Sequence, residues 1–242
     1  MLIENFLEKS RYNIKVNANL FFVRKNNKVT LPKNITTDLA YLIGLIQGDG
    51  HLKTNERRIG LTMKDKGMIS YVCKILEEHF SYSPTIYKKI DKKMLWEIVI
   101  NSLVIFEFLR INFDLPIGKK KGKQHLSNLI KNDKENLMAW LAGFVDSDGH
   151  ITNYKSLEIV QSSKEILEEL ANILLKHYNA SYRLKYNKAN DGYYLYFNKN
   201  NFLKFSDKLS KFMQNNDKLA KMGPTGIEPV ASALYSPKTS QS

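Results

Sequence analysis

The sequence contains one cysteine, Cys73, and no run of 18 apolar residues. A single thiol excludes a disulfide framework and a zinc site built from cysteines. The lack of a long apolar run excludes a membrane-spanning helix. The first six residues also lack the basic start and apolar centre of a secretion signal. We therefore expect an intracellular protein, cytoplasmic or organellar, that has no membrane partner.

Acidic residues are scarce relative to basic ones. The 242 residues include 37 Lys+Arg and 24 Asp+Glu, which gives a formal net charge of +13 and a pI near 9.5. Hydrophobic residues still make up 43% of the chain, enough for a core. A basic globular protein of this kind favours a polyanionic partner, with nucleic acid first and an anionic membrane surface second.

Two nonamers repeat at half-chain spacing. Residues 42–50 read LIGLIQGDG and residues 141–149 read LAGFVDSDG, so that each position recurs 99 residues later. One such nonamer would be a weak signal, because Asp-Gly is a common turn dipeptide. Two copies, each followed by the same pattern of elements, predict a duplicated domain.

Apolar periodicity predicts the order α-β-β-α-β-β-α in both halves. An α+β fold of two pseudo-symmetric repeats follows, with two antiparallel sheets. In the first repeat we expect helices at 38–47, 65–80 and 102–111 and strands at 51–53, 57–63, 84–90 and 94–100. In the second we expect helices at 134–145, 163–178 and 199–213 and strands at 150–153, 156–161, 182–187 and 193–197.

These elements divide the chain into five parts. They are an N-terminal extension (1–36) with strand-like pieces at 12–16 and 20–23, a first repeat (37–111), a basic linker (112–133), a second repeat (134–213) and a flexible C-terminal tail (214–242). The run 119–123 in the linker contains four lysines. It is either a solvated spacer or a segment that also contacts phosphates.

The helix that ends each nonamer carries small residues four apart, Gly44 and Gly48 in one and Gly143 and Ser147 in the other. Small residues at this spacing let two helices approach closely, so we expect the two motif helices to pack together about a pseudo-two-fold axis. Asp49 and Asp148 then emerge side by side at two helix C-termini. That position is electrostatically unfavourable for carboxylates, whereas a divalent cation stabilises it. With DNA as partner, the pair indicates metal-assisted phosphodiester hydrolysis.

Both nonamers resemble the LAGLIDADG motif of homing endonucleases, in the single-chain form that carries two motifs. The second copy matches at six of nine positions and so does the first, which departs at Ile43, Gln47 and Gly48. The resemblance covers about residues 37–213. It implies that a central pair of motif helices stands between two sheets that form a DNA-binding saddle.

The resemblance also implies the site residues. The last acid of each motif is the catalytic, metal-binding residue, which falls on Asp49 and Asp148, with Gly48 and Ser147 as further metal ligands and Mg²⁺ or Mn²⁺ as the cofactor. A basic residue after the second strand falls on Lys64 in the first repeat, where the second repeat has Ser162. Gln161 is expected to orient a water there, or Lys164 to reach in.

Basic and aromatic residues gather on the predicted strands and turns of both halves, where alternate side chains are free to contact DNA. The predicted DNA contacts are Lys53, Arg57, Arg58, Lys88, Lys89 and Lys93 in the first repeat, and Thr152, Tyr154, Lys155, Arg183, Lys185, Tyr186, Lys188, Tyr194 and Tyr196 in the second.

The hypothesis is a monomeric, Mg²⁺-dependent, intron-encoded endonuclease that cuts both strands of a long asymmetric target in double-stranded DNA. The alternative is an RNA-splicing maturase, with its host intron RNA as partner, or a DNA-binding protein that keeps the fold without cleavage. Retention of both motif acids favours the nuclease. An intein is a third class, which the sequence disfavours because the chain starts at Met1 without a nucleophilic Cys or Ser.

Overall fold

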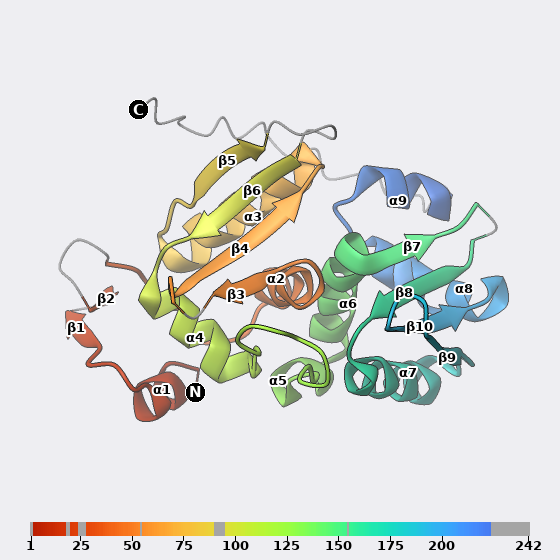
Figure 1. The fold of residues 1–242 in the computed structure, drawn as a ribbon, viewed down its shortest axis with the longest axis horizontal. Coiled ribbons are helices and arrows are strands. Elements are labelled where there is room, and N and C mark those ends of the chain that lie inside the picture. Colours follow the sequence, from red (N-terminus) through yellow and green to blue (C-terminus); the bar gives the residue numbers. More distant parts are fainter. Residues whose placement is uncertain are drawn as a thin grey trace.

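The computed structural model describes residues 2–17, 20–23, 28–53, 55–89, 95–153 and 155–223. It contains the two predicted repeats of order α-β-β-α-β-β-α (Figure 1). The first consists of α2 (Thr37–Gly48), β3 (His51–Lys53), β4 (Arg58–Met63), α3 (Lys66–Phe80), β5 (Thr85–Lys89), β6 (Leu95–Ile100) and α4 (Leu103–Phe113). The second consists of α6 (Lys134–Asp148), β7 (Gly149–Ile151), β8 (Leu157–Gln161), α7 (Lys164–Tyr178), β9 (Arg183–Asn187), β10 (Gly192–Phe197) and α8 (Lys199–Ser210).

Each repeat builds one four-stranded antiparallel sheet. The strand orders are β3-β4-β6-β5 and β7-β8-β10-β9, so the two sheets have the same topology. Alternate residues of a strand point to opposite faces. Ile59 and Leu61 of β4 are buried against the helices, and Arg58, Gly60 and Thr62 therefore lie on the other face. The α+β fold with two pseudo-symmetric halves is confirmed.

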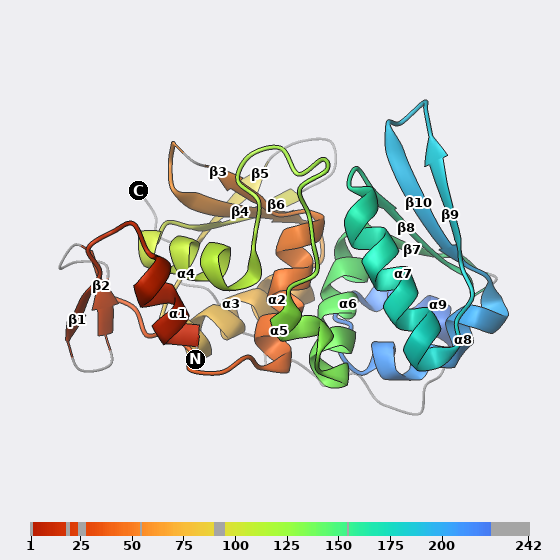
Figure 2. The ribbon, with the colours of Figure 1, turned by 90° about the horizontal axis from the view of Figure 1, so that it is seen from below.

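The motif helices α2 and α6 stand side by side at the centre, with one sheet on each side (Figure 2). Every residue from Leu39 to Gly48 of α2 is buried. A helix that is apolar on all sides has to be enclosed by other elements, and the two halves enclose this one. The side chain of Thr36 caps α2 by accepting from the backbone N–H of Leu39. Asp38 lies in the first turn of α2.

Three parts differ from the sequence prediction. The N-terminal extension contains α1 (Leu2–Lys9), which was not predicted, before a hairpin of β1 (Lys15–Asn17) and β2 (Leu20–Phe22) that occupies the expected strand-like pieces. The linker contains a short helix, α5 (Asn128–Lys131). The predicted flexible tail is wrong at its start, because 216–222 forms α9 (Asn216–Met222). Residues 224–242 lie outside the described part.

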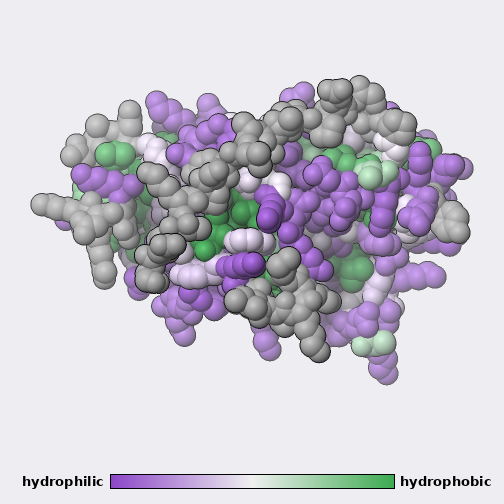
Figure 3. Space-filling view, turned by 90° about the horizontal axis from the view of Figure 1, so that it is seen from above, coloured by the Kyte–Doolittle hydropathy of each residue, from purple (hydrophilic) through white to green (hydrophobic). Residues whose placement is uncertain are grey.

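No helix among the described residues is long and apolar enough to cross a membrane. Seen from above, the coloured surface is mostly hydrophilic, with small hydrophobic areas between (Figure 3). The apolar residues instead form a core that runs through both halves.

Candidate active site and nucleic-acid interface

The crossing of α2 and α6 depends on two glycines. A Cβ atom added at Gly44 would overlap the carbonyl oxygen of Trp140 and lie 2.8 Å from the backbone nitrogen of Phe144. A Cβ at Gly143 would overlap the carbonyl oxygen of Tyr41 and lie 3.0 Å from the nitrogen of Leu45. Real Cβ contacts are longer, so the two backbones approach this closely only because both positions are glycine. The small-residue crossing predicted from the sequence is present.

This close approach brings the ends of the two nonamers together. A Cβ at Gly48 would overlap the hydroxyl of Ser147 and lie 3.2 Å from Oδ2 of Asp148. Asp49 caps the C-terminus of α2, and Asp148 is the last residue of α6. Burial and then the negative charge of Asp49 raise the pKa of Asp148 to about 7, against the opposing effect of Lys120. The two motif acids therefore form an electrostatically coupled pair, as expected.

Two lysines that the sequence did not single out cap the motif helices. The ammonium of Lys120 donates to the carbonyl oxygens of Ile46 and Gln47, both at 3.0 Å, and to that of Gly48. The ammonium of Lys218 donates equivalently at the end of α6, at 2.7, 2.8 and 3.4 Å; its acceptors are the carbonyl oxygens of Val145, Asp146 and Ser147. Each lysine thus places a positive charge at the negative end of a motif helix.

The surroundings of both lysines lower the pKa of their ammonium groups. Burial lowers the pKa of Lys120 to about 8, although the carboxylates of Asp148 and Asp49 oppose the shift. Burial also lowers the pKa of Lys218, opposed by the charges of Asp146, Asp49 and Asp148. Lys120 follows Asp49 by 71 residues and Lys218 follows Asp148 by 70. The two lysines are therefore separated by nearly the 99-residue offset of the nonamers. This recurrence was a signal in the sequence that could have identified them.

The structure shows no contact of Lys64 with the acid pair, and its catalytic role stays a prediction. Lys64 follows β4, is exposed, and makes no hydrogen bond or ion pair within the described part of the chain. The basic residue beside the motif acids in the first half is Lys120, which comes from the linker. The linker run is therefore neither a purely solvated spacer nor free for phosphates at this position. Lys164 pairs with Glu168 at 2.6 Å.

Gln161 lies beside Asp148, and its role in orienting a water stays a prediction. Its side-chain amide donates to Oδ2 of Asp148, and its oxygen accepts from the amide of Gln124 at 3.1 Å. Gln161 pairs with Tyr193 on the neighbouring strand. The same register in the first sheet pairs Met63 with Trp96, so the counterpart of Gln161 is an apolar side chain. The two halves thus differ at the residue beside the motif acid, which is Gln161 in the second half and Met63 in the first.

The residue at the first Asp position of the LAGLIDADG motif, Gln47 in one half and Asp146 in the other, forms hydrogen bonds between the two motif helices. Nε1 of Trp140 donates to the side-chain oxygen of Gln47 at 2.7 Å, and the amide of Gln47 donates to the carbonyl of His125 at 2.9 Å. In the other half, the hydroxyl of Tyr41 donates to Asp146 at 2.8 Å. The backbone N–H groups of Gln214 and Asn215 donate to the same carboxylate oxygen at 2.7 and 3.2 Å. These bonds anchor the segments that carry Lys120 and Lys218.

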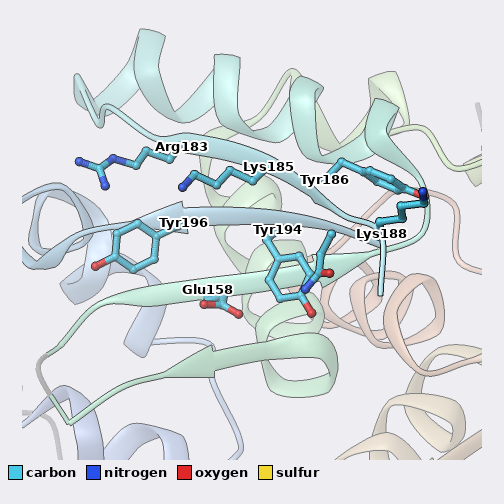
Figure 4. A pocket seen from close by; sticks show the side chains of 8 residues that line it. Glu158, Arg183, Lys185, Tyr186, Lys188, Tyr194 and Tyr196 are labelled. Carbon is cyan, nitrogen blue, oxygen red and sulfur yellow. The ribbon is translucent and has the colours of Figure 1, made fainter. Parts of the chain in front are cut away.

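The open face of the second sheet forms a basic and aromatic hollow. Arg183, Lys185, Tyr194 and Tyr196 project from the face opposite to the buried Leu195 (Figure 4). They line a depression of about 440 Å³ together with Glu158, Tyr186, Asn187 and Lys188.

The predicted contacts in the turns and on the first sheet are distributed unevenly. Lys53 and Arg58 lie on the open face, and both pair with Glu56. Lys88 stacks over Trp96 at 5.9 Å on the face toward the helices, so it is set apart from the others. The hydroxyl of Thr152 bonds that of Ser156 at 2.7 Å.

Arg57 and Lys155 occupy matching turns, with φ of 48° and 57°. Lys93, Tyr154 and the side chain of Lys89 lie outside the described part. The contacts themselves stay predictions.

Comparison with known proteins places these features in a family. The profile of a LAGLIDADG-like domain matches the chain twice, at residues 36–111 and 135–210. An uncharacterised protein of Methanocaldococcus jannaschii is 24% identical over 186 residues, which are 72% of this chain and 66% of that protein. From the same organism, the replication factor C small subunit is 30% identical over 177 residues, or 71% of this chain but 9% of the relative. A glutamine–fructose-6-phosphate aminotransferase is 28% identical over 62% of this chain and 14% of its own length.

Solved structures share the fold. The homing endonuclease I-WcaI bound to its DNA recognition sequence has a TM-score of 0.57 at 20% identity, with 79% of this chain and 88% of that chain covered. I-DmoI in complex with DNA and Mn has a TM-score of 0.55 at 18% identity, over 72% and 96%. The N-terminal LAGLIDADG domain of WhiA has a TM-score of 0.54 at 17% identity, over 72% and 80%. With both repeats matched and the motif helices crossing as described, this chain belongs to the LAGLIDADG family.

Proposed function

We propose that this protein is a site-specific DNA endonuclease of the homing type, which hydrolyses one phosphodiester in each strand at two Asp-centred sites. The observation that supports this most is the pair Asp49 and Asp148, held at two helix ends, each of which is capped by a half-buried lysine. A fold needs no such pair for its stability, because two neighbouring carboxylates at helix C-termini repel each other and the dipoles.

The donor set fits Mg²⁺. Carboxylates and backbone carbonyls are hard oxygen ligands, and Mg²⁺ binds through one or two carboxylates together with substrate phosphates and waters. The described residues include no cluster of three or more His, Cys, Asp or Glu, so we propose that oxygens of the DNA complete the site. The carbonyls of Gly48 and Ser147 already accept from ammonium groups, so they face a cationic position. When bound, Mg²⁺ would polarise the phosphate and lower the pKa of a bound water.

The residues of the chain would bind the cation, orient the motif acid and stabilise the charge on the phosphate. Asp49 and Asp148 bind the cation and fix where the scissile phosphates lie. Gln161 holds Asp148 in its orientation and leaves the second half with a polar side chain beside the attacking water. Lys120 and Lys218 face the charge that develops on the phosphate, and fixed cations in a poorly solvated site stabilise it more than water does.

DNA would lie across the open faces of both sheets, one half-site on each. Arg183, Lys185, Tyr194 and Tyr196 present cations and aromatic rings there, and Lys53 and Arg58 do so on the first sheet. I-WcaI and I-DmoI are DNA-bound in structures of the same fold. Because one chain supplies both motif helices, we propose that it acts as a monomer, inside the cell.

The genetic context we propose is an intron. The relatives of unrelated name share only 14% and 9% of their lengths with this chain, so a similar module lies within longer chains of different names. Host intron RNA is then a second partner to test. The fold is also shared by the WhiA domain, and the first half lacks a polar counterpart to Gln161. These observations favour, as the second candidate, a DNA-binding protein or maturase that does not cleave.

The test starts with a duplex selected for binding from a randomised library. Asp49→Asn and Asp148→Asn should each abolish the double-strand break in Mg²⁺ while binding persists in its absence, because each loses a ligand charge but no DNA contact. Asp207→Asn is the matched control, since Asp207 is exposed on α8. Wild-type protein that binds the duplex but never cuts it with Mg²⁺ or Mn²⁺ would favour the second candidate. Full cleavage by either motif variant would refute the assignment.

Strand-resolved cleavage tests the difference between the halves. Gln161→Met should slow one strand selectively, and Met63→Gln should leave that strand unchanged. End-labelled duplex separates the two rates. Equal slowing of both strands by Gln161→Met would contradict a role confined to Asp148.

A further inference from the structure

The N-terminal extension carries a concentration of positive charge that the proposed active site does not use. Residues 1–36 include seven Lys+Arg and two Glu, so this seventh of the chain supplies a net +5. Lys9, Arg11 and Lys15 are exposed. Neither Lys9 nor Arg11 forms an ion pair or side-chain hydrogen bond with any described residue.

The extension is fixed firmly to the first repeat. Phe6 of α1 is fully buried and packs edge-to-face on Phe108 of α4 with 5.7 Å between ring centroids. The amide of Asn5 donates to that of Asn112 at 2.7 Å. Charges on α1 and on the segment that follows it are therefore held in place, which lowers the entropy lost when they bind a partner.

This fixed position is at the outer end of the first sheet. The guanidinium of Arg57, in the β3–β4 turn, stacks over the ring of Tyr12 at 4.9 Å. Figures 1 and 2 show β1 and β2 beyond this turn, on the side away from α6, whereas α1 is level with the turn and packs on α4. The line from Lys53 and Arg58 on the open face thus continues through Arg57 to the extension. Nothing in the described part of the second repeat supplies an equivalent extension.

A hollow marks the same place. A depression of about 370 Å³ is lined by Lys9, Arg11, Arg110, Ile111, Asp114 and Leu115. Arg110 is already paired with Glu107 through two hydrogen bonds of 2.8 and 3.2 Å, and Asp114 contributes a negative charge. The cations free to bind an anion are Lys9 and Arg11, and Arg57 beside them holds its charge against an aromatic ring.

We propose that this basic extension binds the phosphate backbone of the DNA that flanks the first half-site, so that the protein covers more duplex on the side of the first repeat than on the other. The proposal rests on DNA binding as proposed above. The contacts are to phosphates and carry no sequence information, because lysine and arginine on a surface beyond the sheet reach no base edge. They increase the affinity and help to fix the position of the protein along the duplex, which the two sheets alone would contact with pseudo-two-fold symmetry.

The experiment is hydroxyl-radical footprinting on the library-selected duplex, with long flanks on both sides. Wild-type protein should protect backbone further from the centre on one side, and Lys9→Gln/Arg11→Gln should lose only that outer protection. Loss of two phosphate contacts should also reduce the slope of log K against log salt by about 1.8. Cleavage at saturating protein should be unchanged. Arg183→Gln/Lys185→Gln identifies the other half-site by weakening protection there.

Two controls keep the result clear. Lys176→Gln/Lys199→Gln removes the same charge from exposed positions on α7 and α8 and should leave footprint and slope as in wild type. Tyr12→Leu should weaken the outer protection without a change of charge. A symmetric wild-type footprint, or an unaltered one in Lys9→Gln/Arg11→Gln, would overturn the inference while DNA binding stands. If no duplex is selected at all, the proposed function itself fails. Equal protection of single-stranded RNA and duplex would also overturn the assignment to DNA.

Discussion

Gly44→Ala tests the crossing of the motif helices with a single methyl group. The added Cβ would overlap the carbonyl oxygen of Trp140 and approach the nitrogen of Phe144 to 2.8 Å. Neither backbone atom can rotate away, in contrast to the end of a flexible side chain. The two helices therefore have to separate by at least about 1 Å at this point, and a gap of that size removes roughly a quarter to a half of the dispersion energy of each atom pair across it.

The loss should be large because the crossing lies in the core. All residues of α2 from Leu39 to Gly48 are buried, so separating the two helices affects most of the contacts that α2 makes. Overpacking a core costs about 1–3 kcal/mol, and with a rigid backbone as the obstacle we expect about 3 kcal/mol or more. The tips of both helices should move too, which would separate Asp49 from Asp148 and lower cleavage beyond the loss of folded protein.

Gly192→Ala is the matched control. Its Cβ would meet nothing closer than 3.6 Å, and its φ does not lie in the left-handed region, so the change should be neutral or stabilising by up to about 1 kcal/mol. Urea unfolding followed by tryptophan fluorescence measures both variants, since Trp140 is buried at the crossing. Equal unfolding midpoints for the two alanine variants would refute the close approach of α2 and α6.

Two further predictions concern charge. Lys120→Met and Lys218→Met should each slow one strand by on the order of 10²-fold, while Lys64→Met leaves both rates unchanged; end-labelled duplex at saturating protein measures this, and a slow Lys64→Met would restore that residue to the site. Away from the site, His79, whose Nε2 lies 3.7 Å from the carboxylate, and the hydroxyl of Tyr71, which donates to it at 2.6 Å, lower the pKa of Asp38 despite burial. Its contribution to stability is therefore full above the unfolded pKa of about 3.9 and is lost as pH falls through the lower folded value. The urea midpoint of Asp38→Asn should lie below that of wild type at pH 5 and converge with it near pH 2.5; a constant difference would contradict the linkage.

The order of elements was predictable because each one is amphipathic or caps itself locally. Strand β4 and helix α3 begin within a residue of the expected positions. Helices α1 and α9 were missed for the opposite reason. They are short, and short helices gain their stability from tertiary contacts rather than from their own sequence. For α1 the contact is Phe6 on Phe108, and for α9 it is Lys218 on the end of α6.

The acid pair was predictable from the motif, whereas its basic partners were not. Lys64 was predicted from the resemblance, which places a basic residue after the second strand, and the structure shows it exposed, without a hydrogen bond or ion pair among the described residues. Lys120 comes from the linker and Lys218 from the short helix α9, and only three-dimensional folding brings them to the ends of the motif helices. Their regular spacing after Asp49 and Asp148 becomes interpretable once a duplicated fold is assumed, since equivalent residues of two repeats must recur at nearly the same offset.

The departure of the first motif at Gln47 follows from what this residue has to bind. In the second half, Asp146 receives three donors, one hydroxyl and two backbone N–H groups, and a carboxylate accepts all of them. In the first half the position faces the indole N–H of Trp140 and the carbonyl of His125. One of these needs an acceptor and the other a donor, which a glutamine amide supplies and an ionised aspartate cannot. The motif therefore varies where the linker presents a carbonyl and the tail presents N–H groups, whereas both halves keep Asp at 49 and 148, next to the helix ends that the two lysines cap.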